Sequence, residues 1–184
     1  MGILKINEEE LARYIKDISS GDEASLRSFY DNYGRLILAF ILSIVKSIES
    51  AEEALQDVLM AIVTHQTDNY IKNPKAWLFK VILNISKRKA KQDYYVQAEQ
   101  LPEDENIVSE DNFSESIENT VDQIESLKCL DEIEQQCVIM CVFGQMKLPQ
   151  VAEILGMPYK KVCNKYDYAV RKLRKYYEKR RKSA

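Results

Sequence analysis

Basic and amide side chains near the C-terminus have the types and spacing needed to read DNA. The group comprises Lys160, Lys161, Asn164 and Lys165, and Arg171 and Lys172 follow it. Side chains three or four residues apart share one face of a helix. Lysine and arginine suit phosphates and guanine, and asparagine suits adenine. The pattern favours nucleic-acid recognition, with a solvated face of a helical hairpin as the alternative interpretation.

The elements that would position this group have the pattern of a helix-turn-helix. A short apolar-faced segment, which includes Val151 and Leu155, is followed by the turn Gly156-Met157-Pro158. A second segment then buries Val162 and Ala169 with helical periodicity. In a helix-turn-helix, the early residues of the second helix reach base edges in the major groove.

The rest of the chain also predicts helices, so the expected fold class is all-α. The expected helices run from Asn7 to Ile18 and from Asp22 to about Ser47. A third opens at a Ser50–Glu53 capping box, and a fourth begins at Pro74. Asp131 and Glu134 predict another capping box. Five glycines and four prolines are too few for a turn-rich all-β protein.

The charge of the chain is strongly segregated. The total of 26 basic and 29 acidic residues hides 10 acidic and no basic residues between Asp93 and Gln123. We therefore predict two small helical domains, residues 1–92 and 120–184, joined by a flexible acidic linker at 93–119. The linker is either a simple solvated tether or a segment that repels DNA or covers a basic surface.

Other classes of function find little support in the sequence. It has no glycine-rich phosphate loop, nucleophile signature or His-based triad, so we predict no enzyme activity and no cofactor. Cys137 and Cys141 lie four residues apart, but a zinc site usually needs four ligands. Core packing is the favoured interpretation, and redox sensing is an alternative. No membrane span or signal peptide is evident, which predicts a cytoplasmic protein.

Two stretches resemble bacterial RNA polymerase sigma factors. Ala51-Glu52-Glu53-Ala54-Leu55-Gln56-Asp57-Val58 resembles the A-E-D-L-V-Q-E-V signature of region 2, and residues 75–84 resemble the W-L-Y-R-I-A-R-N helix that follows it. Residues 148–158 resemble the helix-turn-helix of region 4. The two-region form resembles the extracytoplasmic-function (ECF) subgroup.

The resemblance implies a role for each region. Region 2 would bind core RNA polymerase through Glu53, Gln56 and Asp57. The −10 promoter element and strand opening would involve the following residues: Asn69, Tyr70, Lys72, Trp77, Lys80, Asn84, Lys87 and Arg88. For Tyr70 a partly buried loop position is the alternative, and for Trp77 it is core packing. Region 4 would read the −35 element through Lys160, Lys161, Asn164, Lys165, Arg171 and Lys172.

The sequence departs from the family pattern at Leu83, where an arginine is usual, and at Cys163 and Tyr168, where basic residues are usual. The resemblance implies a promoter-specificity subunit whose partners are core polymerase and promoter DNA, at the nucleoid. An anti-sigma protein is a further partner that it admits. A stand-alone helix-turn-helix regulator with an N-terminal dimerisation or sensing domain is the alternative, followed by an α-helical metal enzyme.

Overall fold

The computed structural model describes residues 5–45, 47–65, 71–99 and 125–183. These residues form helices and connecting segments and contain no strand, so the all-α prediction is confirmed. The first four helices are α1 (Glu8–Ser19), α2 (Glu23–Leu42), α3 (Ile48–Val63) and α4 (Pro74–Glu99). The C-terminal elements are η2 (Ser126–Cys129), α6 (Glu132–Val138), the π-helix η3 (Ile139–Phe143), α7 (Leu148–Leu155) and α8 (Tyr159–Ser183).

Side-chain caps fix where the N-terminal helices begin. The Asn7 side chain accepts hydrogen bonds from the N–H groups of Glu9 and Glu10 and so starts α1. Asp22 caps α2, as predicted, but α2 ends at Leu42 rather than near Ser47. The predicted Ser50–Glu53 capping box is wrong. Ser47 caps α3 instead and accepts from the Ser50 N–H, because the helix begins three residues earlier.

The first four helices enclose an aromatic and aliphatic core. Phe29, at 0% exposure, packs edge-on against the rings of Tyr14 and Tyr33. Phe40 packs against Phe79 with 5.6 Å between ring centroids, which ties α2 to α4. These residues recur at helical spacing in the sequence, so burial of one face holds each helix in the bundle.

The C-terminal helices form the predicted helix-turn-helix. Asp131 and Glu134 make the expected capping box at the start of α6. Gly156 ends α7 in the left-handed conformation with φ 64°, which a residue without a Cβ adopts at little cost. The turn brings α8 across α6 and α7, with Val162 and Ala169 fully buried.

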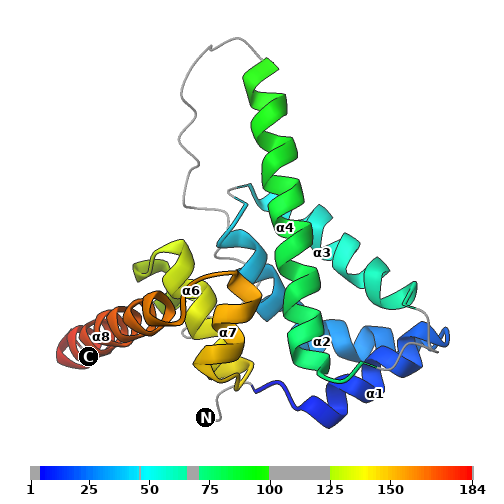
Figure 1. The fold of residues 1–184 in the computed structure, drawn as a ribbon, viewed down its shortest axis with the longest axis horizontal. Helices are drawn as coiled ribbons and strands as arrows, with labels where there is room; N and C mark the ends of the chain where they lie inside the picture. Colours follow the sequence, from blue (N-terminus) through cyan, green and yellow to red (C-terminus); the bar gives the residue numbers. More distant parts are fainter. Residues whose placement is uncertain (1–4, 46, 66–70, 100–124, 184) are drawn as a thin grey trace.

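The C-terminal unit packs directly on the N-terminal bundle (Figure 1). The Ile6 N–H donates to the Phe143 carbonyl at 2.8 Å. A Cβ atom placed on Gly144 would lie 2.8 Å from the Phe79 ring, so α4 and the end of η3 are in close contact. Helix α7 also lies against α4. One continuous hydrophobic core therefore runs through both units.

Helix α4 is longer than the sequence predicts. It continues to Glu99, so residues 93–99 of the expected linker are helical in the structure. Gln92, Ala98 and Glu99 are good helix formers, and no glycine or proline interrupts the segment. The remainder of the expected linker, up to 119, lies outside the described residues. Within the described part, no helix has the length and apolar character needed to cross a bilayer.

Candidate nucleic-acid interface

The six predicted −35 residues share one broad face of α8. At 100° per residue, they fall within an arc of about 140°. Val162 and Ala169 lie outside this arc and are buried against the other helices. Lys160, Lys161 and Asn164 are exposed near the start of the helix, where a recognition helix meets base edges.

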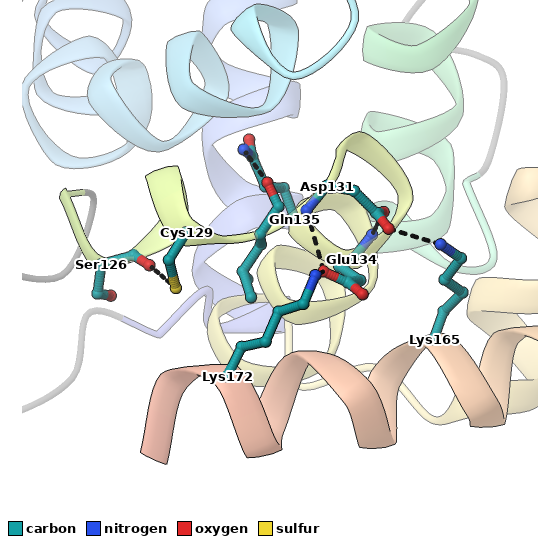
Figure 2. A network of polar contacts seen from close by, with 8 residues as sticks. Ser126, Cys129, Asp131, Glu134, Gln135, Lys165 and Lys172 are labelled. Carbon is teal, nitrogen blue, oxygen red and sulfur yellow. Dashed lines mark hydrogen bonds and ion pairs between the residues drawn. The ribbon is translucent and has the colours of Figure 1, made fainter. Parts of the chain in front are cut away.

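Ion pairs divide this face into two parts (Figure 2). Lys165 Nζ donates to Asp131 Oδ2 at 2.5 Å, and Lys172 Nζ donates to Glu134 Oε2 at 2.6 Å. The Glu134 carboxylate is only 4% exposed and also accepts from the Asp131 N–H. The structure therefore uses Lys165 and Lys172 to hold α8 against the start of α6. Lys160, Lys161 and Asn164 have no such pairing among the described residues.

Arg171 lies on the same face, further along the helix. Its guanidinium carbon is 5.7 Å from the centroid of the Tyr168 ring, and both side chains are exposed. Tyr168 occupies a position where the family usually has a basic residue. Here it supports an arginine one turn away instead of carrying charge itself.

The Asp131–Lys165 pair predicts a pH dependence of stability. Burial alone would raise the pKa of Asp131, but hydrogen bonds from Lys165 and the Glu134 N–H outweigh it, and the pKa is lowered. Its stabilising contribution is therefore complete above the ordinary aspartate pKa of about 3.9 and is lost as pH falls through the lower folded-state value. Urea unfolding between roughly pH 3 and 7 should show a smaller loss at low pH in Asp131→Asn than in wild type.

Asparagine keeps the helix cap at this position, so the comparison isolates the charge. Glu132→Gln, which changes an exposed carboxylate one residue away, is the matched control and should follow the wild-type profile. Equal acid sensitivity in Asp131→Asn and wild type would contradict a stabilising ion pair.

A second exposed basic face runs along α4. Lys80, Asn84 and Lys87 are exposed and lie on one side of the helix, with Arg88 at its edge. Leu78, Ile82 and Ile85 are buried on the opposite side, as the sequence predicts. Leu83, which replaces the usual arginine, is only 2% exposed and belongs to the core.

The predicted polymerase-binding side chains lie beside this basic face. Glu53, Gln56 and Asp57 are exposed on α3. Arg88 Nη2 donates to Asp57 Oδ2 at 2.8 Å, and Lys89 pairs with Glu53. Predicted polymerase contacts and predicted DNA contacts therefore neutralise each other here. Both pairs are largely solvent-exposed, so each adds little to folding stability.

The start of α4 holds the residues expected near the captured base. Lys72 is exposed, and Trp77 is half-buried with its ring 5.0 Å from that of His65. Trp77 thus combines core contact with a partly exposed edge. Asn69 and Tyr70, the residues expected to hold the flipped base, lie outside the described residues. His65 has no counterpart in the sequence prediction, because its contact with Trp77 joins residues 12 positions apart.

The cysteines lie in and around the core of the C-terminal unit. Burial raises the pKa of Cys137 to about 12 and that of Cys141 to about 11, so neither thiol ionises near neutral pH. Cys163 is half-buried and Cys129 exposed. The described residues include no cluster of three or more His, Cys, Asp or Glu side chains that could hold a metal ion.

Two family models match the two helical units. The model of sigma-70 region 2 matches residues 29–93, and the model of sigma-70 region 4 matches residues 126–175. Together they cover more than half of the chain. The chain belongs to the sigma-70 family. This confirms the resemblance, including the order of the regions, and the two-region form is that of an ECF-type sigma factor.

Solved structures share the fold of this sigma factor at low sequence identity. CnrH, in a complex with the cytosolic domain of CnrY, is 16% identical with a TM-score of 0.50, and the match covers 92% of this chain and 97% of CnrH. The sigma factor RpoE, in a complex with the anti-sigma factor NepR from Bartonella quintana, is 18% identical with a TM-score of 0.48. That match covers 83% of this chain and 98% of RpoE. No curated protein sequence matches the chain significantly.

Proposed function

We propose that this sigma factor is a promoter-specificity subunit. It binds core RNA polymerase, recognises the −35 and −10 elements and assists strand opening, with no catalytic chemistry of its own. The observation that supports this most strongly is the presence of two separate exposed basic faces, on α4 in region 2 and on α8 in region 4. Such a protein acts at the nucleoid, in the cytoplasm.

On this proposal, Lys160, Lys161 and Asn164 read bases of the −35 element, and Arg171 binds phosphate. Lys165 and Lys172 are mainly positioning residues, since Asp131 and Glu134 already neutralise them. In region 2, Lys80, Asn84, Lys87 and Arg88 hold the −10 DNA backbone, with Lys72 and Trp77 near the opening strand. Base capture by Asn69 and Tyr70 remains part of the proposal.

Core polymerase is the proposed partner of the acidic face of α3. A basic surface of the polymerase would compete with Arg88 and Lys89 for Asp57 and Glu53, which leaves the two cations available for DNA. Polymerase binding would thus expose charge that DNA binding needs. CnrH, which shares the fold, is bound by the cytosolic domain of CnrY, and an anti-sigma protein is the expected third partner here.

Asp57→Ala should weaken binding to core polymerase by about tenfold, because it removes a carboxylate from the proposed interface. Its exposed pair with Arg88 contributes little to folding, so the melting temperature should stay within a few degrees of wild type. Fluorescence titration of labelled core polymerase measures the affinity. Glu52→Ala, also exposed on α3 but outside the proposed interface, is the matched control and should bind like wild type.

Two outcomes separate the proposals. Unchanged core affinity in Asp57→Ala would contradict the docking assignment alone. A wild-type protein that ignored core polymerase and bound one duplex site tightly by itself would overturn the sigma function and favour a stand-alone regulator.

A further inference from the structure

The last described turns of α4 present exposed aromatic side chains beside a lysine. Tyr94 is 69% exposed and Tyr95 56% exposed. Their ring centroids are 6.0 Å apart, and Lys91 Nζ lies 5.8 Å from the centroid of Tyr95. In Figure 1 this end of α4 extends well beyond the other helices, so the three side chains have no core to cover.

These residues continue the basic face of α4. At 100° per residue, Lys80, Asn84, Lys87, Lys91, Tyr94 and Tyr95 fall within an arc of about 100°. Lys91 lies in the middle of this arc, with a tyrosine on either side. From Lys80 to Tyr95 the stripe is about 22 Å long at 1.5 Å per residue, which matches six or seven base pairs of DNA at about 3.4 Å each.

The chemistry of the stripe favours a nucleic-acid backbone over a protein. Lysine ammonium groups and tyrosine hydroxyls are both common donors to phosphate oxygens. An apolar docking surface for a protein would be depleted in lysine at its centre, whereas Lys91 lies between the two rings here. A tyrosine can also place its ring against the sugars while its hydroxyl reaches a phosphate.

The position of the stripe on α4 indicates which part of the DNA it meets. Tyr95 is about 32 Å along the helix from Pro74, where the strand is proposed to open, and this distance equals about nine base pairs. From this end of α4 the chain leads on to region 4, which takes the −35 element. DNA at this end therefore lies between the two promoter elements and remains double-stranded.

We propose that Lys91, Tyr94 and Tyr95 form an additional binding surface for the duplex just upstream of the −10 element. The surface extends the contact of region 2 by about three base pairs beyond Lys87 and binds the backbone rather than particular bases. The inference rests on the proposed sigma function, because it takes the direction of the DNA from the two promoter elements.

Open-complex formation on two templates tests this surface, with holoenzyme made from core polymerase and the full chain. The first template carries the complete promoter, and the second is pre-melted at −10 and ends just upstream of that element. The variant combines Lys91→Ala, Tyr94→Ala and Tyr95→Ala. We expect about a fivefold loss of affinity on the first template and no change on the second. The salt dependence on the first should weaken by about one unit of slope for the lost lysine contact.

Gln92→Ala, an exposed change on the same turn, is the control and should match wild type on both templates. Equal affinity of the triple variant and wild type on the complete promoter would overturn the surface and leave the sigma function intact. An equal loss on both templates would also overturn it, in favour of contact with the melted strand or with polymerase. If wild type itself formed no open complex with core polymerase, the proposed function would fail and this inference with it.

Discussion

Lys160→Ala combined with Asn164→Ala should reduce transcription from a −35-dependent promoter by roughly 30- to 100-fold. Each of these residues is exposed in the first turns of α8 and is proposed to contact a base edge. Loss of one good base contact costs about 1–3 kcal/mol, so two lost contacts account for the expected range. Multi-round transcription in vitro with reconstituted holoenzyme measures the effect.

The position of Lys160 and Asn164 makes this pair a cleaner test than Lys165 or Lys172. Lys165 is paired with Asp131, and Lys172 with the nearly buried Glu134. Removal of either lysine would leave a carboxylate without its partner and loosen α8, so a loss of transcription would mix folding with recognition. Lys160 and Asn164 carry no comparable pair within the described residues, and their loss should leave the melting temperature unchanged.

Lys175→Ala is the matched control, since it removes an exposed lysine from the same helix four turns further on. It should reduce activity by less than threefold, the size expected for one phosphate contact or none. A promoter whose −35 element is scrambled supplies the second control, because wild type and the double variant should transcribe it equally poorly. Equal activity of wild type and double variant on the intact promoter would contradict base reading by this part of α8.

The predictable parts of the fold are those that local patterns encode. The faces of α1, α4 and α8 follow from apolar residues at helical spacing, and the Asp131–Glu134 capping box follows from a four-residue signature. The capping of α3 failed because Ser47 and Ser50 are both suitable caps, and their local sequences do not distinguish them. The extension of α4 was missed because acidic composition was taken as a sign of a linker, although glutamate is also a good helix former.

Contacts between distant segments could not be read from the sequence. Lys165 and Lys172 have the residue type of DNA contacts, and only the fold shows that Asp131 and Glu134 face them across more than 30 residues. The pairing of Arg88 with Asp57 has the same cause. Charge and spacing therefore identified the right helix faces but overestimated how many of their cations are available to DNA.

Phe79→Ala should lower the free energy of unfolding by about 3–5 kcal/mol, the usual cost of removing a buried phenylalanine ring. Phe79 is 2% exposed, packs on Phe40 and lies against Gly144 at the end of η3. The substitution therefore removes packing within region 2 and support for region 4 together. For a chain of this size, the expected fall in melting temperature is about 6–20 °C, measured by calorimetry.

Phe29→Ala is the matched control, because Phe29 is fully buried between Tyr14 and Tyr33 in region 2 and is not part of the contact with η3. Both variants should lose stability, but only Phe79→Ala should loosen region 4 from region 2. Small-angle scattering under native conditions should then show a larger radius of gyration for Phe79→Ala than for Phe29→Ala. Identical radii would mean that the Ile6–Phe143 hydrogen bond and the packing of α7 on α4 hold the regions together without this ring.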